Sequence, residues 1–210
     1  MRQTLDYLRE TVSQTAGPYV HIGLAPGAAG FDIYREELGR DIAGPNARGQ
    51  RIRVEGLVID GMGSPVKDVL IEVWQANAAG LYENQQPDCQ PELNLRGKLR
   101  TDRKGGFNFL SVKPGGYALP SDGPVGRLMT ALGCPLERPA HVHFRVTAKG
   151  HQTLTTHIFD RADPAIDRDA IFGVRPELLA DFHAIRTSRG AREHLLDVKL
   201  VLCPLEPRQD

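Results

Sequence analysis

The chain has 210 residues, and its Lys and Arg residues balance its Asp and Glu residues at 26 each. This neutrality argues against nucleic-acid binding and against binding to an anionic membrane. The cysteines Cys89, Cys134 and Cys203 form no C-x-x-C pair, which argues against a zinc knuckle or a disulfide framework and is typical of the cytosol. With no run near 18 apolar residues and no apolar segment among the first ten, we expect neither a membrane span nor a secretory signal.

Short β-branched runs separated by Gly and Pro turns dominate the chain from residue 51 onward. We expect strands over residues 51–59 with a bulge near Gly56, 69–75, both sides of the turn at 104–106, 140–144, 154–159 and 195–202. Helical spacing predicts short helices over 125–132 and 176–185. The pattern predicts an all-β fold, a β-sandwich of mixed sheets with one or two short helices in loops. We expect one domain over 1–210, with an N-terminal arm over 1–50 and a sandwich core over 51–203.

Two histidines lie one residue apart in the run RPAHVHF at 138–144. On a strand, His141 and His143 would point to the same face and present two imidazoles side by side. Imidazole is the commonest metal ligand, although half-exposed strand histidines would give the same pattern. The pair therefore predicts a metal site only if further ligands come from elsewhere.

Two tyrosines are candidates for those ligands. Tyr82 follows Gly80 after the strand at 69–75, and Tyr117 follows the turn at 113–116. Either could instead be a strand-end aromatic that packs on the core. Two phenolates with two imidazoles would form a hard, anionic N₂O₂ set, which suits Fe(III) better than Zn²⁺ or Fe(II).

Taken together, the segments IEVWQAN at 71–77 with GLY at 80–82, PGGY at 114–117 and RPAHVHF at 138–144 resemble the intradiol aromatic-ring dioxygenases. The resemblance implies an enzyme that opens catechols with non-haem Fe(III) and O₂ to a cis,cis-muconate-type diacid. It implies four ligands, Tyr82, Tyr117, His141 and His143. It also implies that Tyr117 is the ligand that leaves and acts as base, and that Arg138 stabilises charge developing on the ring.

The resemblance is uneven along the chain. Residues 13–24 through Gln75 are similar to the alpha chain of protocatechuate 3,4-dioxygenase, in which the positions of Thr15 and Tyr19 line the pocket. From residue 86 the chain is similar to hydroxyquinol and catechol 1,2-dioxygenases, and His157 matches the hydroxyquinol enzymes. We therefore expect Thr15, Tyr19 and His157 to bind substrate, and hydroxyquinol to be preferred over catechol and protocatechuate.

Two alternatives to this enzyme remain open from the sequence. The alpha-like N-terminal third favours a non-catalytic subunit of a protocatechuate 3,4-dioxygenase complex, but such subunits have lost metal ligands and this chain retains all four positions. A β-sandwich binding module without redox chemistry would explain the strands alone. We expect a homo-oligomer, or else a hetero-oligomer with a second intradiol subunit.

Overall fold

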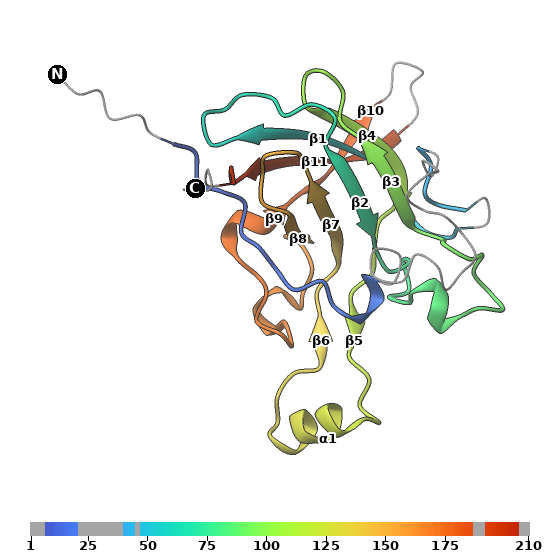
Figure 1. The fold of residues 1–210 in the computed structure, drawn as a ribbon. Helices are drawn as coiled ribbons and strands as arrows, with labels where there is room; N and C mark the ends of the chain where they lie inside the picture. The colour runs from blue at the N-terminus through green and yellow to red at the C-terminus, as the bar shows by residue number, and fades with distance from the viewer. Residues whose placement is uncertain (1–6, 21–39, 45–46, 187–191, 206–210) are drawn as a thin grey trace.

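Two mixed β-sheets form the body of the protein in a computed structural model that describes residues 7–20, 40–44, 47–186 and 192–205 (Figure 1). The first sheet has the order β10 (Phe182–Arg186), β11 (Arg192–Leu202), β1 (Arg51–Asp60) and β4 (Gly106–Val112). The second has the order β3 (Arg96–Arg100), β2 (Leu70–Trp74), β7 (His141–Thr147), β8 (Leu154–Asp160) and β9 (Leu179–Ala180). The β1–β11 and β8–β9 pairs are parallel and the others antiparallel. The predicted sandwich of mixed sheets is confirmed.

The hydrophobic core lies between the two sheets. The β7 residues that pack in this core show to which face the other β7 side chains point. Val142, Phe144 and Val146 are fully buried in this core, where residues of β1, β4 and β11 also pack. Side chains alternate between the two faces of a strand. His141 and His143 therefore lie on the outer face of the second sheet, opposite the core. Each is nevertheless only 2% exposed, so another segment must cover that face.

The N-terminal segment provides part of this cover. Leu8, Thr11 and Gln14 donate backbone hydrogen bonds to the carbonyls of Gly61, Val201 and Thr155, at 2.8, 3.0 and 2.7 Å. The segment runs along β8 and ends in a 3₁₀ helix, η1 (Pro18–Val20), near the ends of β5 and β7 (Figure 1). The described part of the predicted arm thus packs on both sheets. Residues 1–6, 21–39 and 45–46 of the predicted arm lie outside the described residues.

A two-stranded ribbon lies outside both sheets. It pairs β5 (Tyr117–Ala118) with β6 (Glu137–Arg138), and Tyr117 and Arg138 are direct Cα partners. The connection contains α1 (Pro124–Ala131), which begins with a proline in its first turn and projects away from the sandwich (Figure 1). The helix predicted for residues 125–132 is confirmed. Among the described residues, no helix has the length and apolarity to cross a bilayer.

The helix predicted for residues 176–185 is wrong. This stretch contains a 3₁₀ helix, η4 (Pro176–Leu178), followed by β9 and β10. The spacing of Leu178, Leu179 and Phe182 suits a helix, but Leu179 pairs with β8 and Phe182 with β11. Tertiary strand pairing therefore overrides the local pattern. Two more 3₁₀ helices, η2 (Glu83–Gln85) and η3 (Ile166–Arg168), lie in the loops.

The bulge predicted near Gly56 is also wrong. Strand β1 keeps an unbroken register through Gly56 with Phe107 of β4 and Val198 of β11. A Cβ at Gly56 would lie 2.1 Å from Cζ of Phe107. The glycine is therefore explained by the space that the aromatic ring occupies over its backbone.

Candidate metal centre

The strand register places the two histidines of β7 in a row of buried rings. His143 lies between Trp74 of β2 and His157 of β8, and the Trp74 ring stacks on it with centroids 4.7 Å apart. His141 Nδ1 lies 2.6 Å from the carbonyl oxygen of Pro139. This nitrogen must donate its proton to the carbonyl, which leaves Nε2 of His141 unprotonated, the form in which it can bind a metal.

The donor atoms of His141, His143 and Tyr82 lie together, and the ring of Tyr117 lies beside them. His141 Nε2 lies 3.0 Å from His143 Nε2, which lies 3.1 Å from Tyr82 Oη. Arg138 Nη1 lies 3.2 Å from His141 Nε2 and 3.4 Å from Tyr117 Oη, and the two tyrosine rings meet edge to face at 5.7 Å. Separations of about 3 Å are those of adjacent ligands bonded to one ion at about 2.1 Å. The spacing therefore fits a shared metal ion.

The electrostatics of the donor atoms fit a cation as well. Burial, followed by the nearby positive charge of Arg138, lowers the pKa of His141 well below its usual value; burial and the neighbouring His141 do the same for His143. Both imidazoles are therefore neutral, as metal ligands must be. Burial and the neighbouring Tyr117 raise the pKa of Tyr82 well above 10. Its phenol keeps its proton unless a bound ion displaces it, which requires a strongly polarising cation.

His157 completes a cluster of three histidines whose ring nitrogens lie within 4.8 Å of one another. Its Nε2 donates to the backbone oxygen of Thr15 at 2.9 Å, and its Nδ1 accepts from Arg138 Nη2 at 3.3 Å. Burial, and then the charge of Arg138, lower the pKa of His157 to about 4, so the ring is neutral and can accept this hydrogen bond. Because both nitrogens are engaged within the protein, His157 is unsuited to be a fifth ligand.

Arg138 is only 4% exposed and lies between the histidines and a carboxylate that the sequence did not suggest. Its Nε donates to Asp169 Oδ1 at 3.0 Å, and Asp169 is also 4% exposed. Asp169 follows η3 in an irregular loop, where no periodic pattern marks a residue as buried. Sequence analysis therefore missed it.

The N-terminal segment lies against the ligands of its own chain. The ring of Tyr19 stacks on Tyr82 with centroids 4.2 Å apart and meets Tyr117 edge-on at 6.4 Å. Arg96, which is fully buried, donates to the Tyr19 carbonyl oxygen and to Glu83 Oε1, both at 2.6 Å. This ion pair fixes Glu83, the residue next to Tyr82, and no sequence pattern predicted it.

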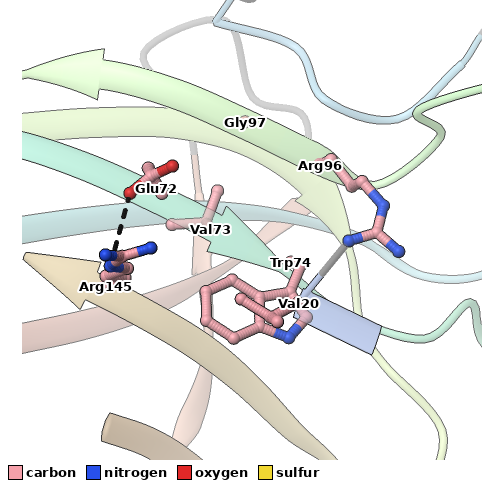
Figure 2. A pocket seen from close by; sticks show the side chains of 7 residues that line it. All are labelled: Val20, Glu72, Val73, Trp74, Arg96, Gly97 and Arg145. Atoms are coloured by element: carbon pink, nitrogen blue, oxygen red, sulfur yellow. Dashed lines mark ion pairs between the residues drawn. The ribbon is translucent and has the colours of Figure 1, made fainter. Parts of the chain in front are cut away.

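Figure 2 shows the neighbourhood behind Trp74, where Arg96 approaches from β3 and Arg145 of β7 forms an ion pair with Glu72 at 3.8 Å. Val20 of the N-terminal segment lies over Trp74 in this view. The cavity between these side chains measures about 10 Å³. It has room for about one water molecule, and a catechol-sized substrate does not fit in it.

The chain is similar to known dioxygenases in sequence. A family model described as "Dioxygenase" matches residues 29–202. Hydroxyquinol 1,2-dioxygenase of Rhizobium sp. (strain MTP-10005) is 46% identical over 148 residues, which cover 70% of this chain and 50% of that protein. 6-Chlorohydroxyquinol 1,2-dioxygenase of Cupriavidus pinatubonensis is 40% identical, and the alignment covers 79% of this chain and 58% of that protein.

The fold is similar to solved structures of the same kind. The crystal structure of hydroxyquinol 1,2-dioxygenase from Pseudomonas putida DLL-E4 superposes with a TM-score of 0.78 at 31% identity and covers 97% of this chain and 69% of that one. The chain spans about half the length of these curated hydroxyquinol 1,2-dioxygenases.

Proposed function

This chain belongs to the intradiol ring-cleavage dioxygenases, and from that premise we propose that it cleaves a catecholic ring with O₂. The carbon–carbon bond between the two hydroxyl-bearing carbons breaks, both oxygen atoms enter the product, and a cis,cis-muconate-type diacid results. The proposal rests on one observation: two imidazole nitrogens and the phenol oxygen of Tyr82 lie together on the outer face of the second sheet, with the ring of Tyr117 beside them.

We propose that Tyr82, Tyr117, His141 and His143 hold Fe(III). When bound, the iron supplies a site that chelates the catecholate and makes it reactive toward O₂. Tyr82, at 1% exposure beneath the ring of Tyr19, is the ligand that stays in place. Tyr117 is half-buried on the ribbon, and as a phenolate its Oη takes a proton from the incoming substrate. Arg138 keeps its positive charge and faces the charge that develops on the ring.

Hydroxyquinol is the substrate that these residues favour. Protocatechuate carries a carboxylate, which needs a cation if it is to be buried. Arg138 is already paired with Asp169, and Arg127 is exposed on α1, where it donates to the carbonyl of Asp122. The third hydroxyl of hydroxyquinol needs only a neutral partner, and relatives 43–46% identical to this chain bear the name of that substrate. Thr15 and Tyr19 remain the proposed substrate-binding residues, whereas His157, which was predicted with them, has both ring nitrogens bonded to Thr15 and Arg138 and has neither left for the substrate.

We expect hydroxyquinol to have a specificity constant roughly 5- to 150-fold above those of catechol and protocatechuate. A hydroxyl contact that a rival substrate cannot make costs about 1–3 kcal/mol, and 1.4 kcal/mol is a factor of ten. Oxygen uptake by the iron-loaded protein, with all three substrates in one buffer, measures the order. A preference for protocatechuate would contradict this assignment.

Purified iron-loaded protein should be reddish, because tyrosinate bound to Fe(III) absorbs visible light by charge transfer. Tyr82→Phe and Tyr117→Phe should each change this band, whereas Tyr7→Phe, at a side chain 65% exposed, should leave it unchanged. Visible spectra together with iron analysis provide the measurement. A colourless protein with a full complement of iron would rule out the tyrosine ligands.

The alternative function is a non-catalytic alpha-type subunit. It predicts that the isolated chain retains little iron and takes up no oxygen until a catalytic partner is added. The complete ligand set argues against it. Whether the chain is a homo-oligomer or pairs with a second intradiol subunit stays a prediction, which light scattering with and without such a partner would test.

A further inference from the structure

Two nitrogens of the Arg138 guanidinium hold the side chain in place, and the third faces the metal centre. Nε donates to Asp169 Oδ1 at 3.0 Å, and Nη2 donates to His157 Nδ1 at 3.3 Å. Only Nη1 faces the centre, where it lies within 3.4 Å of both Tyr117 Oη and His141 Nε2. The direction of the guanidinium is thus set from its opposite side.

We infer that Asp169 is a positioning residue, which fixes the guanidinium of Arg138 so that Nη1 points at the reacting ring; this inference rests on the proposed function. Both side chains are nearly inaccessible, at 4% and 2% exposure. In such surroundings the positive charge of a guanidinium without a carboxylate partner is costly, and the side chain would turn toward water or toward another acceptor. Among the described residues, Asp169 is the carboxylate that forms an ion pair with Arg138.

The loop around Asp169 is built to hold its carboxylate. The backbone oxygen of Asp169 accepts from Phe172 N at 2.9 Å, and its Oδ2 accepts from Gly173 N at 2.8 Å. Ala170 N donates to the carbonyl of Glu137, the residue before Arg138, at 2.8 Å. The turn also forces Phe172, an exposed non-glycine residue, to a φ of +55°. Such a conformation persists only where the surrounding contacts impose it.

The test uses the iron-loaded protein and the variant Asp169→Asn, which keeps the shape of the side chain and removes its charge. We expect kcat to fall roughly 10–100-fold, with KM nearly unchanged. This loss is typical when a residue that orients a side chain of the site is removed. Iron content and the visible band should not change. Asp169→Glu, which keeps the carboxylate, should retain more activity than Asp169→Asn and provides a second variant.

Two comparisons separate positioning from a merely structural role. If Asp169 acts through Arg138, adding Asp169→Asn to Arg138→Gln should cause little further loss of kcat. Asp160→Asn is the matched control, because Asp160 is also buried in an ion pair, with Lys113 at 2.6 Å, that does not reach the centre. It should lower the melting temperature and leave kcat unchanged.

A readout that does not need turnover comes from NMR of the iron-free protein. The Nε–H signal of Arg138, identified by its loss in Arg138→Gln, should exchange slowly in the unmodified chain and rapidly in Asp169→Asn. Equal kcat for Asp169→Asn and the unmodified protein, or losses that multiply with those of Arg138→Gln, would overturn the inference. If the unmodified iron protein consumed no oxygen with any catechol, the proposed function would fail instead, and the NMR signal would still decide whether Asp169 holds Arg138.

Discussion

Replacing either His141 or His143 with alanine is expected to abolish ring cleavage and to remove most of the bound iron. Each imidazole directs its Nε2 at the same point, and the two nitrogens are 3.0 Å apart. Losing a residue that only hydrogen-bonds to a metal ligand typically costs 10–100-fold in metal affinity or activity. Losing the ligand itself should cost more than about 100-fold, so the purified variants should hold far less than one iron per chain by elemental analysis.

The control for this experiment is His183→Ala, at an exposed position of β10 in the other sheet. It should bind iron and turn over substrate like the unmodified protein. Far-UV circular dichroism should show that all three variants keep the sandwich, because the core residues on β7 face the opposite side of the sheet. Stoichiometric iron in both His141→Ala and His143→Ala would refute the metal centre.

Arg138→Ser should lower kcat by roughly 10²–10³-fold and change KM far less. The magnitude is that of removing one preorganised electrostatic contact that strengthens only as the transition state forms. The geometry supports this role, because Nη1 lies beside Tyr117 Oη and His141 Nε2 while Nε and Nη2 are bound elsewhere. Steady-state oxygen uptake separates the two constants.

Arg161→Ser is the matched control for Arg138→Ser, since Arg161 forms an exposed ion pair with Asp181 at 3.3 Å. Its kcat and KM should both stay at the values of the unmodified protein. A raised KM with an unchanged kcat in Arg138→Ser would reassign Arg138 to substrate binding.

The parts of the fold that could be predicted from sequence are those with a local pattern. Alternation marked β7 and placed His141 and His143 on one face, and the proline-started run at 124–131 formed the predicted helix. The helix predicted for residues 176–185 was wrong because pairing with β8 and β11 overrides the helical spacing of apolar residues. The prediction at Gly56 was wrong because the glycine makes room for the ring of Phe107, which lies on another strand.

The buried polar partners around the centre could not be read from sequence. Asp169 and Arg138 are 31 residues apart, and Glu83 and Arg96 are 13 apart across an irregular loop. A charged residue in a loop is normally solvent-exposed, so only the folded chain shows that these are enclosed ion pairs. The proposed iron ligands were easier to identify, because residue type and the spacing of motifs limit them to a few positions.

The separate two-stranded ribbon has a consequence for how such proteins diverge. Tyr82, His141 and His143 depend on the second sheet, whereas Tyr117 and Arg138 face each other on a ribbon that forms hydrogen-bonded pairs with neither sheet. Insertions, deletions or substitutions within 119–136 would therefore alter the spacing and tilt of Tyr117 and Arg138 and spare the histidine pair. Sequence changes in that stretch would therefore act on the proposed base and the charged side chain beside it, while Tyr82 and the two imidazoles keep their positions at the second sheet.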